Sequence, residues 1–331
     1  MNLPMTYDPD RVPPVVAADQ DEHGNTHWVS QAAFSLISAA LMLSQVALGF
    51  AYHAGWIWLC LPLAFLVSHL MHGLLIGFHE ASHGLLRKNR FLNEVDGLIT
   101  GTLSFMSFTL YRAAHQKHHS HLATERDVEL WPFVIVSAPR WGRCLAAFVE
   151  LNAGILFTPF LFLRIFLMKD SFIRNKKVRR RIWKEFGLIV AVWTVIFTTV
   201  SLCHVWPYFI WLFLGPAVIA GNLQSWRKYI EHVGLSGHTA RSATRSIVAK
   251  TWSGRLLSLT LLHEPLHGIH HLKMALPHEE LPHYAELLNP LAADDIPPFP
   301  NYRSALIDLL RNLSDPKSGS HWPNTQPESK V

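Results

Sequence analysis

Nine histidines gather in four short segments of a sequence of 331 residues that is otherwise rich in apolar side chains. They are His79 and His83; His115, His118 and His119; His232; and His267, His270 and His271. Neutral imidazole is the commonest metal ligand in proteins, and one ion has too few coordination positions to use nine of them. The histidines therefore predict two metal ions that share one cluster.

The spacing within each segment favours the same interpretation. Residues three or four apart lie on one face of a helix, about one turn apart, so His79 and His83 can point at a common centre. His115 and His118 form a pair three residues apart, and the ring directly after them points elsewhere, which lets one helix end serve two ions. The segment that begins at His267 repeats this pattern. A single pair would suit polar residues at a membrane exit, but the repetition indicates metal ligands.

The composition places this cluster in a membrane protein. Apolar residues make up 50% of the chain and charged residues only 16%, whereas soluble domains average about 25% charged. Residues 12–86 and 185–226 contain no Lys or Arg and hold the longest apolar runs, as a bilayer core requires. The net charge of +5 then reflects basic flanks of membrane segments. A nucleic-acid partner is not expected, because no binding motif accompanies the basic residues.

Four segments are apolar enough to cross a hydrocarbon core of about 30 Å. They are residues 32–51, 56–78, 187–205 and 208–222, and we expect them to form two helical hairpins. The apolar run at 97–110 is too short to cross and return, so it should dip into the membrane or lie along its surface. The run at 144–168 is long enough, but a single crossing there would separate His232 from His119. We therefore expect an interfacial or bent re-entrant segment at 144–168.

The distribution of positive charge orients the chain in the membrane. The loop at 169–184 carries eight Lys or Arg residues against one acid, Asp170, and the positive-inside rule places such a loop in the cytoplasm. An even number of crossings then puts all histidine clusters and both termini on that side. The predicted fold is an all-α polytopic membrane protein with four transmembrane helices and a cytoplasmic, histidine-rich cap. Its parts are a flexible cytoplasmic tail at 1–30, a membrane domain at 31–290 and a C-terminal cytoplasmic tail at 291–331.

These segments resemble the three histidine boxes of the integral-membrane fatty acid desaturase and hydroxylase superfamily, which have spacings of HX3H or HX4H, HX2HH and HX2HH. His79 and His83 match the first box, and His232 matches an additional family position before the third. The second box is matched by His115, His118 and His119, and the third by His267, His270 and His271. The sequence TERD at 124–127 and the Leu281-Pro282 pair look like the usual continuations, and the resemblance covers roughly residues 72–288.

The resemblance implies a non-haem di-iron centre, O2 as co-substrate, a lipid acyl substrate and a separate electron donor of the ferredoxin or cytochrome type. It favours a fatty acyl desaturase that introduces a C=C bond. A hydroxylase or ketolase acting on an alkyl or isoprenoid lipid stays open, since both reactions begin with the same hydrogen abstraction. One position departs from the pattern: some acyl-CoA desaturases have Asn one turn before the additional histidine, where this chain has Lys228.

Acidic residues near the boxes are candidates to orient the imidazoles, because each ligand ring needs an acceptor at its second nitrogen. The candidates are Glu80, Asp127, Glu231 and Glu264. Asp127 is the one that we favour most. We interpret Glu125 and Glu129 as solvated surface acids.

Two other functions compete with the di-iron oxidoreductase. Residues 79–83 also read H-E-x-x-H, the signature of zinc proteases in which two histidines bind zinc and the glutamate acts as general base. That interpretation leaves seven clustered histidines without a role. A membrane metal transporter or sensor is the other alternative, but transporters place ionisable ligands near the middle of the bilayer, whereas these clusters follow the ends of apolar segments. Metal analysis separates the three: two irons, one zinc, or weak exchangeable binding.

Overall fold

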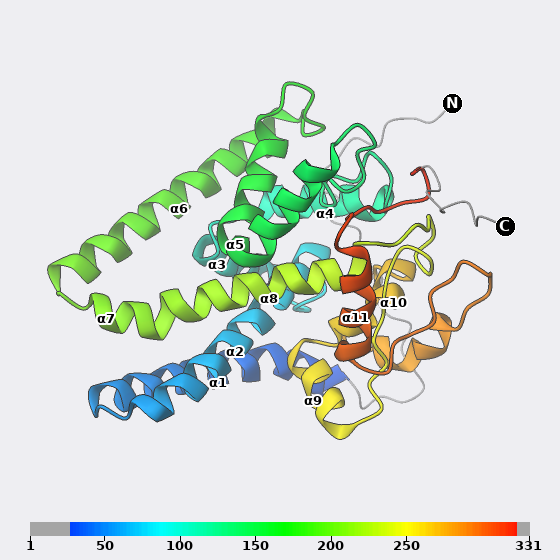
Figure 1. The fold of residues 1–331 in the computed structure, drawn as a ribbon. Coiled ribbons are helices and arrows are strands. Elements are labelled where there is room, and N and C mark those ends of the chain that lie inside the picture. Colours follow the sequence, from blue (N-terminus) through cyan, green and yellow to red (C-terminus); the bar gives the residue numbers. More distant parts are fainter. Residues whose placement is uncertain (1–26, 323–331) are drawn as a thin grey trace.

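The structure, a computed structural model, describes residues 27–322 (Figure 1). The tail predicted at 1–30 therefore falls almost wholly outside the described residues. Within them the chain is helical, and the only extended pairing is a bridge between Ile247 and Phe299. The prediction of an all-α chain is confirmed for this part of the sequence.

Eleven α-helices make up the described fold. They are α1 (His27–His53), α2 (Ile57–His83), α3 (Arg90–Leu103), α4 (Phe108–Ser120), α5 (Arg140–Leu167), α6 (Lys176–Leu202), α7 (Trp206–Phe209), α8 (Gly215–His232), α9 (Trp252–Thr260), α10 (His267–Leu272) and α11 (Tyr302–Asn312). A π-helical turn at Ile210–Leu214 makes α7 and α8 continuous, and 3-10 turns occur at Glu264–Leu266 and Leu281–Leu288.

Two long hairpins form the membrane part. In Figure 1, α1 with α2, and α6 with α7 and α8, extend to the left with their turns at the same end, while α10 and α11 lie at the right. The first turn contains Gly55 at a φ of +74°, which favours glycine, and the second ends where α7 begins at Trp206-Pro207. Five segments are long and apolar enough to span a membrane: Ala32–His53, Ile57–His83, Arg140–Leu167, Lys176–Leu202 and Trp206–His232.

Helix α5 is the fifth candidate span, one more than the four expected from the sequence. Its length and composition suit a crossing, but its backbone breaks at Ala153, where φ is −137° and ψ is 39°. At one end, the Arg140 side chain donates to the carbonyl of Ser314 (3.0 Å). At the other end, the Arg164 guanidinium lies 3.9 Å from the centre of the Trp131 ring. Both ends therefore contact segments beside the histidine cap, as a bent helix that returns to its starting side would do.

The bend of α5 packs closely on α8. Gly154 donates its backbone N–H to the Asn222 side chain (2.9 Å), and a Cβ at position 154 would lie 2.5 Å from the carbonyl oxygen of Gly221. Only glycine permits this approach of the two backbones. This contact holds the middle of α5 against Gly221, which lies about 11 residues before α8 ends at His232.

Helix α4, which carries the second histidine segment, is held at its start by an acid from α6. Ser107 caps the helix by accepting from the backbone N–H of Leu110 (3.2 Å). Glu185 accepts from the Ser107 hydroxyl (2.6 Å) and from the backbone N–H of Thr109 (2.9 Å). A buried carboxylate at a helix N-terminus satisfies unpaired N–H groups and complements the helix dipole. The contact fixes α4, and with it the second box, relative to α6.

The C-terminal part covers the histidine end of the membrane helices. Helix α11 buries Ala305 and Leu309 in an apolar cluster that includes Tyr229 and Ile230 of α8. Beyond it, the hydroxyl of Ser318 donates to the carbonyl of His232 (3.0 Å). Much of the segment predicted as a C-terminal tail, 291–331, is thus folded onto the cap as far as residue 322.

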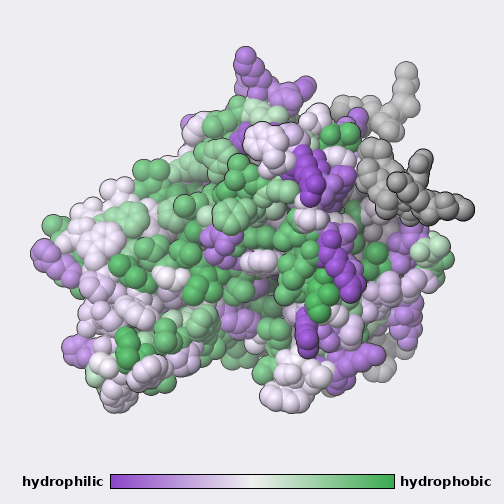
Figure 2. Space-filling view, in the orientation of Figure 1, coloured by the Kyte–Doolittle hydropathy of each residue, from purple (hydrophilic) through white to green (hydrophobic). Residues whose placement is uncertain are grey.

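The outer surface of the helices is that of a multi-pass membrane protein. Figure 2 shows apolar side chains spread over the face formed by α5, α6 and α8, with hydrophilic side chains gathered at the cap and at the loop before α6. Large apolar residues such as Leu43, Trp58 and Val190 are 71%, 85% and 66% exposed. An apolar belt of this extent is typical of contact with lipid.

Candidate metal centre

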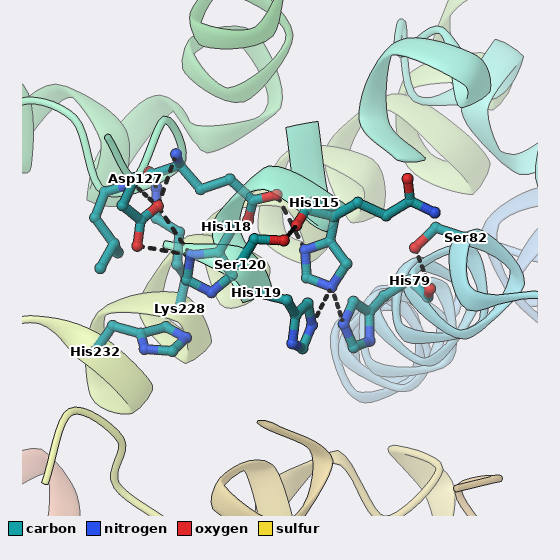
Figure 3. A network of polar contacts seen from close by, with 12 residues as sticks. His79, Ser82, His115, His118, His119, Ser120, Asp127, Lys228 and His232 are labelled. Atoms are coloured by element: carbon teal, nitrogen blue, oxygen red, sulfur yellow. Dashed lines mark hydrogen bonds and ion pairs between the residues drawn. The ribbon is translucent and has the colours of Figure 1, made fainter. Parts of the chain in front are cut away.

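All nine histidines of the four segments, supplied by α2, α4, α8 and α10, meet at one end of the helices. Figure 3 shows five of them: His79, His115, His118, His119 and His232. The nine form two groups. The first contains His79, His83, His115, His119 and His270, whose ligand nitrogens all lie within 4.8 Å of one another. The second contains His118, His232 and His271, on the same criterion, and His267 beside them. Each group has enough nitrogens to hold one ion.

The first group is a close arrangement of ring nitrogens. The Nε2 atom of His115 lies 2.8 Å from Nε2 of His79 and 3.0 Å from Nε2 of His119. The Nε2 atom of His119 lies in turn 3.1 Å from Nε2 of His270. His83 points its buried Nε2 at the same centre without a hydrogen-bond partner among the described residues, and its ring is 4.8 Å from that of His115.

The second group repeats this geometry. Nε2 of His267 lies 2.8 Å from Nε2 of His232 and 3.0 Å from Nε2 of His271. The ring of His118 packs edge-on against both His232 (4.8 Å) and His271 (5.0 Å). His119 of the first group stacks on His271 of the second, with ring centres 4.2 Å apart. The adjacent rings of the second and third boxes therefore bring the two groups into contact.

The hydrogen bonds around the rings show that this donor set fits metal ions. A neutral imidazole has one N–H, and in His115 and His267 a carboxylate accepts it at Nδ1. The lone pair on each Nε2 atom then faces nitrogens of other imidazoles. A cation bound among these lone pairs would stabilise the arrangement. Two nitrogens bound about 2.1 Å from one ion at right angles lie about 3.0 Å apart, close to the spacing of the rings. Imidazole donors suit first-row transition metals better than Mg²⁺ or Ca²⁺.

Burial keeps most of these rings in the uncharged form that metal binding requires. Burial lowers the pKa of His119, His270 and His271 well below its usual value, and the neighbouring rings lower it further. For His118 burial also lowers the pKa, but the Asp127 carboxylate outweighs it, so the pKa of this ring is raised.

Carboxylates at the outer edge of the cluster orient the rings. Asp127 accepts from Nδ1 of His118 with both oxygens, at 2.8 and 2.9 Å (Figure 3). Glu264 accepts from Nδ1 of His267 (2.9 Å), and its other oxygen lies 3.3 Å from Nδ1 of His79. Because these two histidines belong to different groups, Glu264 links the groups through one carboxylate.

The other two proposed acids are placed differently. Glu231 lies 3.6 Å from Nε2 of His267, but its closer partner is the Arg227 guanidinium at 2.8 Å. Glu80 is fully buried beside His79 and Glu264, and neither of its oxygens has a hydrogen-bond partner among the described residues. Asp127 and Glu264 therefore contact the rings directly, whereas Glu231 and Glu80 lie beside this contact layer.

An apolar cavity of about 310 Å³ lies among the helices beside this centre. Its walls come from α1, α2, α3, α5 and α8 and include Leu41, Met71, Leu74, Phe78, Ile155 and Ala217. Tyr111, Thr158 and Gln224 line both this cavity and a second one of about 40 Å³. The walls of the smaller cavity include His118 and His232, so the shared residues lie between the apolar cavity and the histidines.

Residues 56–302, most of the chain and all nine histidines, match the sequence model of the fatty acid desaturase family. The chain belongs to this family. The match includes the three histidine boxes read from the sequence.

Two curated relatives align with this desaturase-family chain. A protein named fatty acid desaturase from Bacillus subtilis (strain 168) is 23% identical over 240 residues, which are 67% of this chain and 66% of the relative. A protein named alkane 1-monooxygenase 2 from Pseudomonas aeruginosa is 24% identical over 256 residues, which are 73% of this chain and 60% of the relative. The chain thus spans just under two thirds of the first relative and less of the second.

The prediction that Glu129 is a solvated surface acid was wrong. Glu129 is not a surface acid: it is buried and accepts from Nδ1 of His115 at 3.0 Å. Burial raises its pKa to about 7. Asp127 turns the chain by accepting from the backbone N–H of Glu129 (3.2 Å), which brings the second acid back toward the rings. The Asp-x-Glu spacing was the available signal, whereas Glu125 is exposed as expected.

Two cations near the centre, Arg227 and Lys228, were not among the predicted site residues. Arg227 pairs with Glu264 (2.5 Å) and with Glu231, so it neutralises the acids behind His79 and His267. Lys228, the departure from the acyl-CoA desaturase pattern, forms an ion pair with Glu150 of α5. The Tyr229 hydroxyl donates to the same carboxylate (3.0 Å). This pair attaches the bent α5 to the metal centre.

Proposed function

We propose that the protein is an O2-dependent membrane oxidoreductase that desaturates a fatty acyl chain at a di-iron centre held by the nine histidines. One observation carries the proposal: two groups of imidazoles adjoin a small cavity that shares Tyr111, Thr158 and Gln224 with an apolar cavity among the membrane helices. The combination suits oxidation of a hydrocarbon chain, since a metal-assisted hydrolysis would call for a polar substrate cleft.

The histidines divide between the two ions according to their groups. His79, His83, His115, His119 and His270 would hold one iron, and His118, His232, His267 and His271 the other. Iron bound there would supply the activation of O2 and the removal of hydrogen from an unactivated C–H bond. Since the ligands are neutral, the acids behind them, Asp127, Glu129 and Glu264, offset the positive charge of the ions and fix the ring orientations.

The remaining residues of the site position the acyl chain of the substrate and exclude water. Tyr111 stacks on His115 with ring centres 5.4 Å apart and lies at the junction of the two cavities with Thr158 and Gln224. A chain that reaches this junction contacts apolar walls over its length and a few polar groups at the reacting end. Such a site binds by apolar contact and selects the reacting carbon by position.

Hydroxylation is the second candidate reaction. The family and the Bacillus subtilis relative favour desaturation, whereas the Pseudomonas aeruginosa relative is named as a monooxygenase. Both outcomes begin at the same C–H bond. In either case we propose that electrons come from a separate ferredoxin or cytochrome-type protein.

We propose that the histidine end and the basic loop before α6 face the cytoplasm, with α5 bent back to the same side. The exposed cations Lys176 and Lys177 support this orientation by the positive-inside rule. Labelling a Lys176→Cys variant with an impermeant thiol reagent, with the exposed Cys203 replaced, tests it: only disrupted cells should react. Labelling of intact cells would reverse the orientation.

Product analysis tests the reaction. Purified protein given O2, an electron donor and a long-chain acyl lipid should yield a product lighter by two hydrogen atoms, and metal analysis should find two irons per chain. A product heavier by one oxygen atom assigns the hydroxylase. One zinc per chain and no oxidised lipid would refute the oxidoreductase.

A further inference from the structure

We infer that substrate reaches the cavity sideways from the bilayer, through an opening between α3 and α5, and that the protein acts on a hydrocarbon chain already dissolved in the membrane. The inference deepens the proposed function and rests on it for the identity of the ligand as an alkyl chain. Three features of the described residues carry it: where the cavity reaches the surface, how deep that point lies, and what closes the other end.

The cavity reaches the surface at α3. Ile99 and Leu103 line it and are nevertheless 54% and 36% exposed, whereas the wall residues Leu41, Phe78 and Ala220 are buried. A residue that both lines a cavity and is exposed marks its mouth. Ile155 and Pro159 of α5, just beyond the break in that helix, line the same cavity.

This mouth lies at the level of the hydrocarbon core. The indole of Trp193 donates to the carbonyl of Thr102 at the end of α3 (2.9 Å) and stacks on Phe105, with ring centres 4.3 Å apart. Trp193 follows Lys184, the last cation of α6, by nine residues, or about 13 Å along a helix that rises about 1.5 Å per residue. Leu103 is next to Thr102, so it faces lipid chains at this depth.

The cytoplasmic end of the cavity offers no comparable route. There the smaller cavity has a volume of about 40 Å³, and its walls include the charged groups of Arg227, Glu231 and the Lys228–Glu150 pair. An apolar chain that passed these groups would remove their remaining solvation, which is costly. A chain that enters from the bilayer meets mainly apolar walls, and no charged group, until it reaches Tyr111 and Gln224.

The position of the mouth also sets the direction of the chain. A polar head group gains nothing from an opening bordered by Ile99 and Leu103, so it stays outside while the methyl end goes in first. Carbons near the methyl end then lie beside the histidines.

Photolabelling tests this without turnover. The full chain is reconstituted in phosphatidylcholine vesicles that contain a long-chain alcohol with a diazirine near its methyl end, irradiated, and mapped by peptide mass spectrometry. We expect label on the peptides that hold Tyr111, Thr158 and Gln224. With the diazirine near the hydroxyl, label should move to the α3 peptide that holds Ile99 and Leu103.

Blocking the mouth provides the decisive comparison. Leu103→Trp and, independently, Ile99→Trp should lower cavity labelling roughly tenfold, because an indole in the mouth displaces the chain. Leu92→Trp is the matched control, since Leu92 lies on the same helix, is 49% exposed and does not line the cavity. It should label like the native chain.

Two results would overturn the inference. One is cavity labelling that both mouth variants leave unchanged; the other is labelling only by the same alkyl chain supplied as a water-soluble coenzyme A thioester. A His118→Ala chain should be labelled like the native protein. Because the readout needs neither metal nor turnover, loss of the proposed reaction leaves this test valid.

Discussion

The metal centre and the apolar cavity meet at Tyr111, yet they are built by opposite means. At the centre several rings are held by directional contacts, as when Asp127 holds His118 and Glu264 holds both His79 and His267. In the cavity most wall residues make only apolar contacts. Directional contacts fix atoms to within a fraction of an ångström, whereas apolar packing tolerates changes of volume. A single substitution should therefore destroy function in the centre and adjust it in the cavity.

The largest effect is expected from removal of one histidine ligand of the metal centre. His118→Ala should abolish product and lower the iron content, because the ligands of one ion act as a unit. The same result is expected for the other histidines of the three boxes. His238→Ala is the matched control, since His238 lies in the cap but is exposed. Near-normal turnover in most of the ligand variants, with normal expression, would end the di-iron assignment.

The Lys228–Glu150 pair tests whether charge or only volume matters beside the centre. Lys228→Met leaves the fully buried Glu150 without its cation and should destabilise the protein by about 3–5 kcal/mol. Adding Glu150→Leu should recover most of that loss, because no buried charge remains unpaired. Thermal unfolding in detergent measures both. If the double variant loses as much stability as Lys228→Met and Glu150→Leu lose together, the two residues do not act as an electrostatic unit.

The orientation of a single ring is the next test. Asp127→Asn keeps the shape of the side chain but replaces the charged acceptor of His118, so metal affinity and activity should fall about 10- to 100-fold. Iron retention during dialysis against a chelator provides a readout other than activity. The control is Glu125→Gln, which changes an exposed acid two residues earlier. Equal effects of the two changes would argue against a positioning role for Asp127.

The smallest effect is expected in the cavity wall. Leu74→Ala enlarges the cavity without touching a histidine, so iron content should stay unchanged while the preferred chain becomes longer or bulkier. Each additional methylene that gains burial is worth about 0.8 kcal/mol, or roughly fourfold in relative rate. Competition between chains of different length measures the shift, with Leu43→Ala on the lipid-facing side of α1 as control. An unchanged preference would mean that this wall does not contact substrate.

The local sequence was sufficient to predict features that depend on helical spacing or on a continuous apolar segment. The spacing of His79 and His83 dictates that their rings share a helical face, whatever the rest of the fold does. The apolar segment predicted at 32–51 corresponds to the span Ala32–His53. Prediction was poorer at 187–205, because α6 begins at Lys176: hydropathy marks where a helix is apolar, and the basic turns before that point are helical as well.

The sequence alone predicted the nine histidine ligands and indicated the family and the membrane setting, because residue type, spacing and apolar runs are local properties. Only the tertiary structure decided that Glu129 faces His115, that Glu264 joins both groups, and that α5 bends against α8. It also decided which residues of α1, α2, α3, α5 and α8 come together to line the apolar cavity. These features arise from contacts between residues far apart in the chain. Such contacts leave no periodic or compositional mark, because their energies depend on which surfaces the whole fold brings together.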